Sequence, residues 1–319
     1  MTSISILDPT TLLGREIAEH VAAAFPGVQR RYFHTADTEE HLILELAEAP
    51  ALVPPLTSCD ELHGSAAVVV PQGIPDRMAL ELLSWLNGNP DVALVDVSQP
   101  GIAGDVAVTV LDGAAPGAGP RWLHLADPGL FGPVRLVRAL GPLGPEALRL
   151  TMLRPVSDRG EEGMQELAAQ GAARLSGASP GSPRHLPAVL AFDLHPSGAG
   201  VRASLERQLA ALLPGMPCTV QPVDAGVFHG HAAAAMVAVG ETATETALKN
   251  LVRKVPGMRP ARASDGLHPS DIAGKDEVLC SELRITGTEV AAWLLADGLR
   301  VGGAQAVVSV LTDLGVLSA

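Results

Sequence analysis

The chain has 319 residues, which is long enough for two domains that each contain a sizeable core. Its formal net charge of -13, without basic patches, argues against nucleic acid or an anionic membrane as a partner. Although 47% of the residues are hydrophobic, no apolar run is long enough to span a membrane and the first residues lack the pattern of a signal peptide, so we expect a cytoplasmic protein.

Neither the cysteines nor the histidines have the pattern of a metal site. Cys59, Cys218 and Cys280 are far apart and lack the spacing of metal ligands, so we interpret them as ordinary reduced thiols. His229 and His231 are two positions apart and would share a face of a strand. Two histidines without a third ligand at a known spacing are weak support for a metal site, and we expect none.

The N-terminal part predicts a parallel α/β domain. Residues 3–7 predict a strand, and residues 14–24 predict a helix. The apolar residues Ile17, Val21 and Ala24 are expected on the inward face of this helix. Further along, residues 66–70 and 93–97 predict buried strands on either side of a helix at 75–86. Strand, helix and strand in this order indicate parallel pairing through right-handed crossovers.

The central stretch predicts a strand at 122–126, a tight turn at 127–129, a helix, and a second strand at 148–153. The apolar face of that helix consists of Leu130, Val134, Val137 and Leu140. The turn places Leu130 at the N-terminus of the helix, where backbone N–H groups favour a thiolate or an anion. Leucine provides neither.

The composition also predicts where the domains divide. Residues 112–120, DGAAPGAGP, are typical of a flexible hinge, and we place the boundary near Leu125. The first domain then comprises residues 1–125 plus 297–319, and the second comprises residues 126–296.

The second domain predicts a long exposed loop followed by a helix and two strands. Residues 176–185 are rich in Gly, Ser and Pro, so we expect them to be exposed and mobile. Residues 201–213 predict an amphipathic helix, and residues 218–223 and 226–239 predict strands. The run AAAAMVAV in the second strand is typical of a strand covered on both faces. The last helix is expected at 303–314.

The order and spacing of the central motifs resemble the aspartate-semialdehyde dehydrogenase family. That family carries a nucleophilic cysteine in an Asn-Pro-Asn-Cys turn, then a Gln-x-Val-Ser-Gly-x-Gly strand end and a Gly-x-x-Glu-Leu helix start. This chain has DPGL at 127–130, RPVSDRG at 154–160 and GMQEL at 163–167. Leu130 therefore stands at the nucleophile position and Arg154 at the glutamine position. Loss of the cysteine makes the chain similar to the Usg-type paralogues of the family.

The resemblance covers nearly the whole chain and implies an α/β fold. It implies a Rossmann-like nucleotide-binding domain and an α+β dimerisation and catalytic-type domain. In the family, the extended sheet of the second domain buries its outer face in a homodimer, and we expect the same here. The family context is amino-acid biosynthesis.

Two further positions complete the expected site. In VFHGHA at 227–232, the second histidine matches the acid/base histidine of the family, so His231 is a vestigial acid/base candidate. Asp224 stands where the family has an arginine that binds the substrate carboxylate. Because a buried unpaired charge is costly, we expect Arg154 to pair with an acid, Asp224 being the first choice. The alternative role for Arg154 is binding a small carboxylate ligand.

The nucleotide-binding loop of the family, Gly-Ala-Thr-Gly-x-x-Gly, is DPTTLLG at residues 8–14. Thr10, Thr11 and Gly14 hold the cofactor-binding positions, and only Gly14 keeps a family glycine. Asp8 adds like charge against a phosphate, and the proline after it removes a backbone donor. The family arginine that holds phosphate after the next strand end is also missing, since none follows Gln99 until Arg121. We therefore expect no cofactor, or NADP if the ancestral site persists.

Two hypotheses follow, and whether the protein is an enzyme stays open between them. The first is a non-catalytic homodimer whose vestigial cleft binds a small molecule or a protein. The alternative is an NADP-dependent oxidoreductase that acts on a semialdehyde-like carbonyl through His231. Ser157 lies outside any Gly-x-Ser-x-Gly elbow, so we predict it to be a helix N-cap and not a nucleophile.

Overall fold

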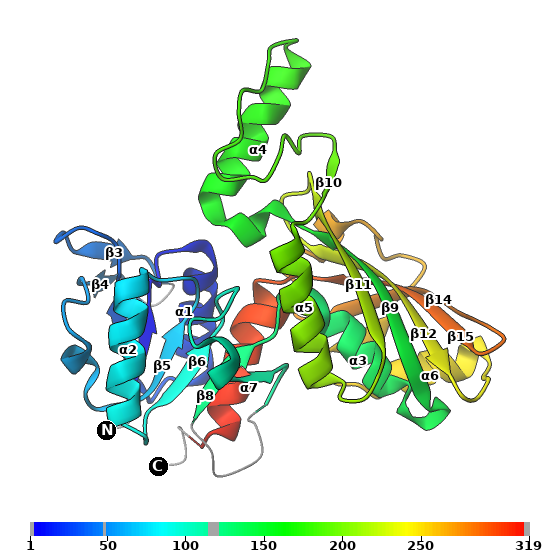
Figure 1. The fold of residues 1–319 in the computed structure, drawn as a ribbon, viewed down its shortest axis with the longest axis horizontal. Helices are drawn as coiled ribbons and strands as arrows, with labels where there is room; N and C mark the ends of the chain where they lie inside the picture. Colours follow the sequence, from blue (N-terminus) through cyan, green and yellow to red (C-terminus); the bar gives the residue numbers. More distant parts are fainter. Residues whose placement is uncertain (1–2, 47–48, 114–120, 316–319) are drawn as a thin grey trace. The chain divides into compact units, whose positions relative to one another are not determined.

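The computed structural model describes residues 3–46, 49–113 and 121–315, which form two compact units (Figure 1). The first unit comprises Met1–Asp127 and Gly302–Ala319, and the second comprises Pro128–Val301. Most of the predicted hinge, residues 114–120, lies outside the described residues.

The first unit is built on a six-stranded parallel sheet in the order β2-β1-β5-β6-β8-β7. Its strands are β1 (Ser3–Leu7), β2 (Gln29–Phe33), β5 (Ser65–Val70), β6 (Ala93–Asp96), β7 (Val108–Val110) and β8 (Trp122–Leu125). A parallel sheet of this kind is covered by helices on its faces, which explains the nearly continuous apolar sequence of its central strands. The predicted parallel pairing is confirmed, whereas the short β2 and β7 were not predicted.

Three helices and a small hairpin complete this unit. The helices are α1 (Leu12–Ala24), α2 (Asp76–Gly88) and α7 (Gln305–Asp313), and the antiparallel hairpin is β3 (Leu42–Leu44) with β4 (Ala51–Val53). Figure 1 shows α2 lying across one face of the sheet, where Leu82 and Leu86 pack with Val68 and Val70 of β5. Helix α1 packs beside α7.

The second unit is built on a seven-stranded mixed sheet in the order β10-β11-β9-β12-β15-β14-β13 (Figure 1). Its strands are β9 (Pro145–Arg154), β10 (Leu194–Pro196), β11 (Cys218–Ala225), β12 (His231–Val239), β13 (Met258–Pro260), β14 (Val278–Thr286) and β15 (Glu289–Ala296). The pairs β9 with β11 and β13 with β14 are parallel, and the other neighbours are antiparallel.

The helices of the second unit are α3 (Phe131–Ala139), α4 (Gly160–Leu175), α5 (Ala199–Leu212) and α6 (Glu245–Arg253). Helix α3 packs against one face of the central strands, and its Gly132 leaves room for Val278 and Leu294. All four apolar positions predicted for the face of this helix are buried, which confirms its orientation.

The opposite face of the sheet remains largely exposed in the single chain. On β9, the side chains alternate between buried Leu148 and Leu150 and exposed Arg149 and Thr151. On β12, Met236 is 45% exposed while its neighbours are buried. In the single chain the AAAAMVAV strand is therefore covered on one face only, and the predicted cover of its other face stays a prediction that depends on a second copy.

Strand β12 begins at His231 and not at Gly226 as predicted. The preceding Gly230 has a φ of 87°, and a Cβ atom there would lie 2.2 Å from the carbonyl oxygen of Pro269. Only glycine fits this left-handed position beside another backbone segment. His229 therefore lies in a turn before the strand and does not share a strand face with His231.

Two smaller predictions also fail. Ser157 is not the N-cap of α4, because it lies within a short 3-10 helix (Val156–Arg159) and Arg159 occupies the cap position without a side-chain hydrogen bond. Ala24, expected to face inward, is exposed at the last position of α1, whereas Ile17 and Val21 are buried as predicted.

Candidate functional site

Three of the predicted site residues lie together at one end of the second sheet. Arg154 is the last residue of β9 and pairs in register with Asp224 near the end of β11. His231 is the first residue of β12, whose next residue, Ala232, pairs with Leu153. The alternating direction of side chains along each strand therefore brings Arg154, Asp224 and His231 to the same end and the same face.

Asp158, four residues after Arg154, joins two of these side chains. Its Oδ2 atom lies 3.1 Å from Nη2 of Arg154 and 3.2 Å from Nε2 of His231. Burial acts to raise the pKa of Asp158, but the attraction of His231 and Arg154 outweighs it and lowers the pKa to about 2. The carboxylate is thus ionised throughout the physiological range and holds both basic side chains.

The expected ion pair of Arg154 is present, but its acid is Asp158 and not Asp224. The reason is local: the 3-10 helix after β9 turns the chain back, so that Asp158 faces the guanidinium four residues before it. Asp224 is only 6% exposed, and its Oδ2 atom is buried without a hydrogen-bond partner among the described residues. His195 lies directly opposite Asp224 on the edge strand β10.

The turn that carries Leu130 lies close to the same cluster. Leu130 and Phe131 are fully buried at the start of α3. An apolar side chain therefore stands where the family has the thiol of its cysteine. Gly298 packs between this turn and His231. A Cβ atom at this position would lie 2.5 Å from Nδ1 of His231 and 2.9 Å from Cβ of Pro128. The absence of a side chain at Gly298 allows the imidazole to reach Asp158.

This arrangement allows limited chemistry. A carboxylate beside one ring nitrogen of a histidine fixes the orientation of the ring and stabilises its protonated form. The cluster can therefore hold or move a proton at His231. Burial disfavours the thiolate form of the three cysteines, because it raises the pKa of Cys218, that of Cys59 to about 11 and that of Cys280 to about 12.

The predicted cofactor loop of the first unit is held by its own side chains. Thr11 caps α1, accepting a hydrogen bond from the N–H of Gly14 at 3.2 Å and donating one to the carbonyl oxygen of Asp8 at 2.8 Å. A Cβ atom at Gly14 would lie 2.3 Å from the same carbonyl oxygen, which explains the glycine. The carbonyl oxygen of Thr10 accepts a hydrogen bond from Nη2 of Arg15 at 3.3 Å.

The carboxylate of Asp8 links this loop to the end of β2. Its Oδ1 atom accepts a hydrogen bond from the N–H of Thr35 at 2.7 Å, and its Oδ2 atom accepts one from the Thr35 hydroxyl at 2.7 Å. Asp8 is buried and has a φ of 45°, a left-handed conformation. The carboxyl ends of β1 and β2 therefore carry a fixed negative charge at the edge where a dinucleotide fold receives its ligand.

Two functional residues were not identified in the sequence. Asp158 stands where the family motif has a glycine, so the motif predicts no role for it. Its spacing of four from Arg154 is the signal that favours an ion pair. Gly298 is likewise absent from the predicted site, because its contact with His231 depends on the pairing of β12 with β15. Sequence spacing does not contain that information.

The described residues contain neither a metal-binding group nor a membrane-spanning helix. No group of three or more His, Cys, Asp or Glu side chains in residues 3–46, 49–113 and 121–315 is arranged to hold a metal ion. No helix in this part of the chain is both long and apolar enough to cross a membrane.

Comparison of sequences links the chain to curated relatives. It is 29% identical to a USG-1 protein homolog of Azotobacter vinelandii over 190 residues, which are 54% of this chain and 56% of the relative. It is 28% identical to a USG-1 protein homolog of Pseudomonas aeruginosa over 185 residues, which are 53% of this chain and 54% of the relative. The matched region thus spans about half the length of these relatives. No protein-family model matches the chain.

Comparison of structures extends over the full chain. Aspartate semialdehyde dehydrogenase II of Vibrio cholerae, solved in complex with ASA, matches with a TM-score of 0.85 and 18% identity over 99% of this chain and 98% of that one. The enzyme of Francisella tularensis matches with a TM-score of 0.80 and 14% identity over 98% and 99% of the two chains. The enzyme of Candida albicans, solved with NADP, matches with a TM-score of 0.70 and 12% identity over 99% of each.

These findings confirm the fold class and the resemblance that the motifs predict. The parallel sheet of the first unit and the mixed sheet of the second match those of the solved enzymes along almost the whole chain. The chain has the aspartate-semialdehyde dehydrogenase fold, and about half of its sequence is similar to USG-1 protein homologs.

Proposed function

We propose that this protein is a non-catalytic homodimer that uses the end of its second sheet, around Arg154 and His231, to bind a small molecule or a protein. One observation carries the proposal: Asp158, whose side chain is 16% exposed, holds the buried side chains of Arg154 and His231 in an ionic cluster, 3.1 and 3.2 Å away. A histidine held in this way beside an apolar helix start has no nucleophile to deprotonate.

Loss of the nucleophile supports the same proposal. The family reaction begins with attack of a thiol on the aldehyde carbonyl, and Leu130 stands at the position of that thiol. The carboxylate-binding arginine of the family is Asp224, which would repel the carboxylate of the family's substrate. The chemistry and the recognition of that substrate have therefore both changed.

The loop of the first unit supports the proposal that the chain does not bind a dinucleotide. A phosphate placed at the loop of the family would meet the carboxylate of Asp8, which Thr35 fixes by two hydrogen bonds. At about 4 Å this repulsion is roughly 1 kcal/mol in water and about 4 kcal/mol at an effective dielectric of 20. Thr11 also occupies the cap of α1 with its own hydroxyl.

The exposed sheet face supports the homodimer. It carries Ala234 and Met236 together with Thr151, and an ion pair between Arg149 and Glu289 at 3.0 Å. In the family the outer face of this sheet is the interface between two copies. Size-exclusion chromatography with light scattering tests the proposal: we expect a dimer for the wild-type chain and a shift to monomer for Ala234→Glu.

A matched variant controls for charge alone. Leu80 is an exposed apolar side chain on α2 of the first unit, at 70% exposure. Leu80→Glu should leave the dimer intact because it lies outside the sheet face. A wild-type monomer at micromolar concentration, or equal behaviour of both variants, would contradict this part of the proposal.

The second candidate function is an NADP-dependent oxidoreductase that acts on a semialdehyde-like carbonyl. It is favoured by the pairing of His231 with Asp158, because such a carboxylate–histidine pair can transfer a proton to a carbonyl oxygen. If the protein is such an oxidoreductase, Arg154 would bind the carboxylate of the substrate. The first unit would bind the nucleotide in a pose that avoids Asp8.

Calorimetric titration with NADPH and NADP separates the two functions. We expect no heat of binding up to millimolar nucleotide, and no oxidation of NADPH with aldehyde substrates. Micromolar affinity in the wild-type chain would overturn the non-catalytic proposal and lead to a screen of carbonyl substrates. The variant Asp8→Gly tests the role of the Asp8 carboxylate in repelling the phosphate of the nucleotide. It removes that carboxylate, and glycine tolerates the positive φ at this position.

A further inference from the structure

Asp224 is an acid of the second sheet whose charge is not balanced within the described part of the chain. The residue is 6% exposed, and its Oδ2 atom is buried without a hydrogen-bond partner. No side chain in residues 3–46, 49–113 and 121–315 forms an ion pair with it. A buried carboxylate without a partner is costly for a fold, so its presence needs an explanation.

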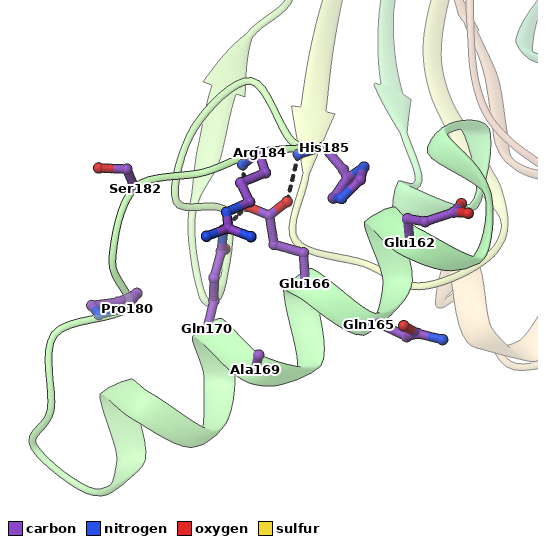
Figure 2. A pocket seen from close by; sticks show the side chains of 9 residues that line it. All are labelled: Glu162, Gln165, Glu166, Ala169, Gln170, Pro180, Ser182, Arg184 and His185. Carbon is purple, nitrogen blue, oxygen red and sulfur yellow. Dashed lines mark hydrogen bonds between the residues drawn. The ribbon is translucent and has the colours of Figure 1, made fainter.

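Other carboxylates of the same unit are held by partners. Glu166, in the shallow pocket between α4 and the loop that follows it, accepts hydrogen bonds from the backbone N–H groups of Arg184 at 2.9 Å and His185 at 2.6 Å (Figure 2). Asp158 joins two basic side chains. These acids stabilise the fold through their contacts, whereas Asp224 has no such contact to explain it.

Asp224 lies in a row of polar residues across one end of the sheet. It pairs in register with Arg154 of β9 on one side and with His195 of the edge strand β10 on the other. Side chains at paired positions point to the same face of a sheet, so Asp224 stands between these two residues. Arg154 is nevertheless bound by Asp158, and His195 forms no ion pair with Asp224.

His195 provides a second polar atom without a partner. Its Nδ1 atom is buried and has no hydrogen-bond partner among the described residues. Paired side chains of antiparallel strands begin about 4.5–5.5 Å apart at their Cβ atoms, yet these two do not bond to each other. A group with two N–H donors between them would satisfy both atoms, because Nδ1 accepts a hydrogen bond when the ring proton is on Nε2.

This position can be approached from the edge of the sheet. Strand β10 is the first strand in the order of the sheet, and His195 on it is only half-buried. Leu194 and Pro196 on either side of it are exposed. A small group can therefore reach Asp224 past the imidazole of His195.

The charges at the sheet end favour a cation. Arg154 and Asp158 balance each other, so Asp224 leaves one negative charge when the histidines are neutral. A water molecule can donate hydrogen bonds to both unpaired atoms, but it does not balance this charge. No group of three or more His, Cys, Asp or Glu side chains in the described part of the chain is arranged to hold a metal ion. An organic cation fits these conditions.

We propose that the sheet end binds the primary ammonium group of a small amine that lacks a carboxylate, through an ion pair with Asp224 beside His195. The three N–H donors of one ammonium group allow it to meet both Oδ2 of Asp224 and Nδ1 of His195. This inference rests on the proposed function, because it names the ligand class of the same site. Binding of the amine would balance the charge that the chain itself leaves unbalanced.

Thermal denaturation without a ligand tests whether the Asp224 carboxylate is unpaired. Asp224→Asn should raise the midpoint by roughly 2 °C, because a neutral amide costs less to bury than an unpaired charge. Glu206→Gln is the matched control: it also removes one negative charge, but from an exposed position on α5, and should leave the midpoint nearly unchanged. A lower midpoint for Asp224→Asn would show that the carboxylate has a structural partner and would overturn the proposal.

Calorimetric titration of the full chain with ethylamine and putrescine tests the ligand class. The buffer is phosphate, because Tris is itself a primary amine. We expect at least one probe to bind at millimolar concentration or below, with affinity about tenfold weaker in Asp224→Asn and unchanged in Glu206→Gln. Tetramethylammonium, which has the charge but no N–H donor, should also bind about tenfold more weakly than ethylamine.

The contrary outcomes are distinct. Equal binding of the amines to the wild type and Asp224→Asn, or no binding of either amine, would overturn the inference. Binding of acetate or succinate that Arg154→Ala abolishes, without binding of an amine, would overturn it while keeping a ligand site at the sheet end. Micromolar affinity for NADPH would overturn the proposed non-catalytic function alone, because the amine titration does not involve the nucleotide.

Discussion

Nε2 of His231 lies 3.2 Å from Oδ2 of Asp158, a residue 73 positions earlier in the chain. The same carboxylate oxygen lies 3.1 Å from Nη2 of Arg154. A single oxygen atom therefore balances two basic side chains at the end of the sheet. Each of the two contacts depends on that oxygen, so the cluster should respond strongly to changes at Asp158.

Replacement of Asp158 by asparagine should strongly destabilise the chain. Removing one partner of a buried ion pair typically costs about 3–5 kcal/mol, because the remaining basic groups lose an attraction that is strong in a poorly solvated site. Urea denaturation of Asp158→Asn against the wild type measures the change. The exposed pair Arg77–Glu81 has the same i, i+4 spacing, and Glu81→Gln should change the unfolding free energy by less than about 0.5 kcal/mol. Equal effects of the two variants would contradict the role of burial.

The stability of the chain should also depend on pH in the acid range through Asp158. The folded pKa of about 2 lies below the ordinary value of 3.8, so the contribution of Asp158 is fully present above about pH 4 and lost as the pH falls through 2. The shift corresponds to about 2 kcal/mol. Denaturation curves at several pH values should show this loss in the wild type and a smaller loss in Asp158→Asn. Parallel pH profiles would show that other carboxylates are responsible.

Gly298→Ala should displace His231. The new Cβ atom would lie 2.5 Å from Nδ1 and 2.6 Å from Cε1 of the imidazole, and overpacking of this kind costs about 1–3 kcal/mol. In the background of His231→Ala the same substitution should cost much less, which a double-mutant cycle measures. Gly171→Ala in α4 is the control, since nothing lies within 4 Å of its Cβ position and alanine favours a helix interior.

Glu166→Gln should loosen the loop at residues 184–186, which Glu166 holds against α4. Hydrogen exchange of the amides of Arg184, His185 and Leu186 should become faster, because the charged acceptor of their hydrogen bonds is lost. Slight burial acts to raise the pKa of Glu166, but the N–H donors outweigh it and lower the pKa below its ordinary value. Protection in the wild type should therefore persist at mildly acidic pH and be lost as the pH falls through that lowered value. Unchanged exchange in Glu166→Gln would contradict this role, and Glu162→Gln is the control.

The conformation of Asp8 predicts an unusual order of substitutions. Its φ of 45° disfavours any residue with a Cβ atom, so Asp8→Ala should be less stable than Asp8→Gly although both lose the two bonds to Thr35. The expected difference is about 1–2 kcal/mol, from the left-handed backbone alone. Thermal denaturation of the two variants measures it. The reverse order would indicate that the loop changes conformation when the carboxylate is removed.

The frame of the fold could be predicted from local patterns. The strand at 3–7 is correct to the residue, and the four apolar positions of α3 are all buried, because alternation and helical spacing are local properties of the sequence. The similarity to a family supplied the connection of these elements into two units. These predictions needed no knowledge of contacts between distant residues.

The rest depended on contacts between segments far apart in the sequence. The start of β12 is set by Gly230, which packs against the carbonyl oxygen of Pro269, and no feature of residues 226–239 contains that information. Arg154 pairs with Asp158 and not with Asp224, because the 3-10 helix after β9 turns the chain back toward Arg154. Only the folded backbone defines this turn.

Helix α4 begins directly after the ionic cluster of the second unit. Asp158 lies two residues before Gly160, the first residue of the helix, and Glu166, which holds the following loop, lies within the second turn. The contacts of Asp158 with Arg154 and His231 therefore anchor the base of the helix to the end of the sheet. A substitution at Asp158 should thus disturb the start of α4 as well as the two basic side chains.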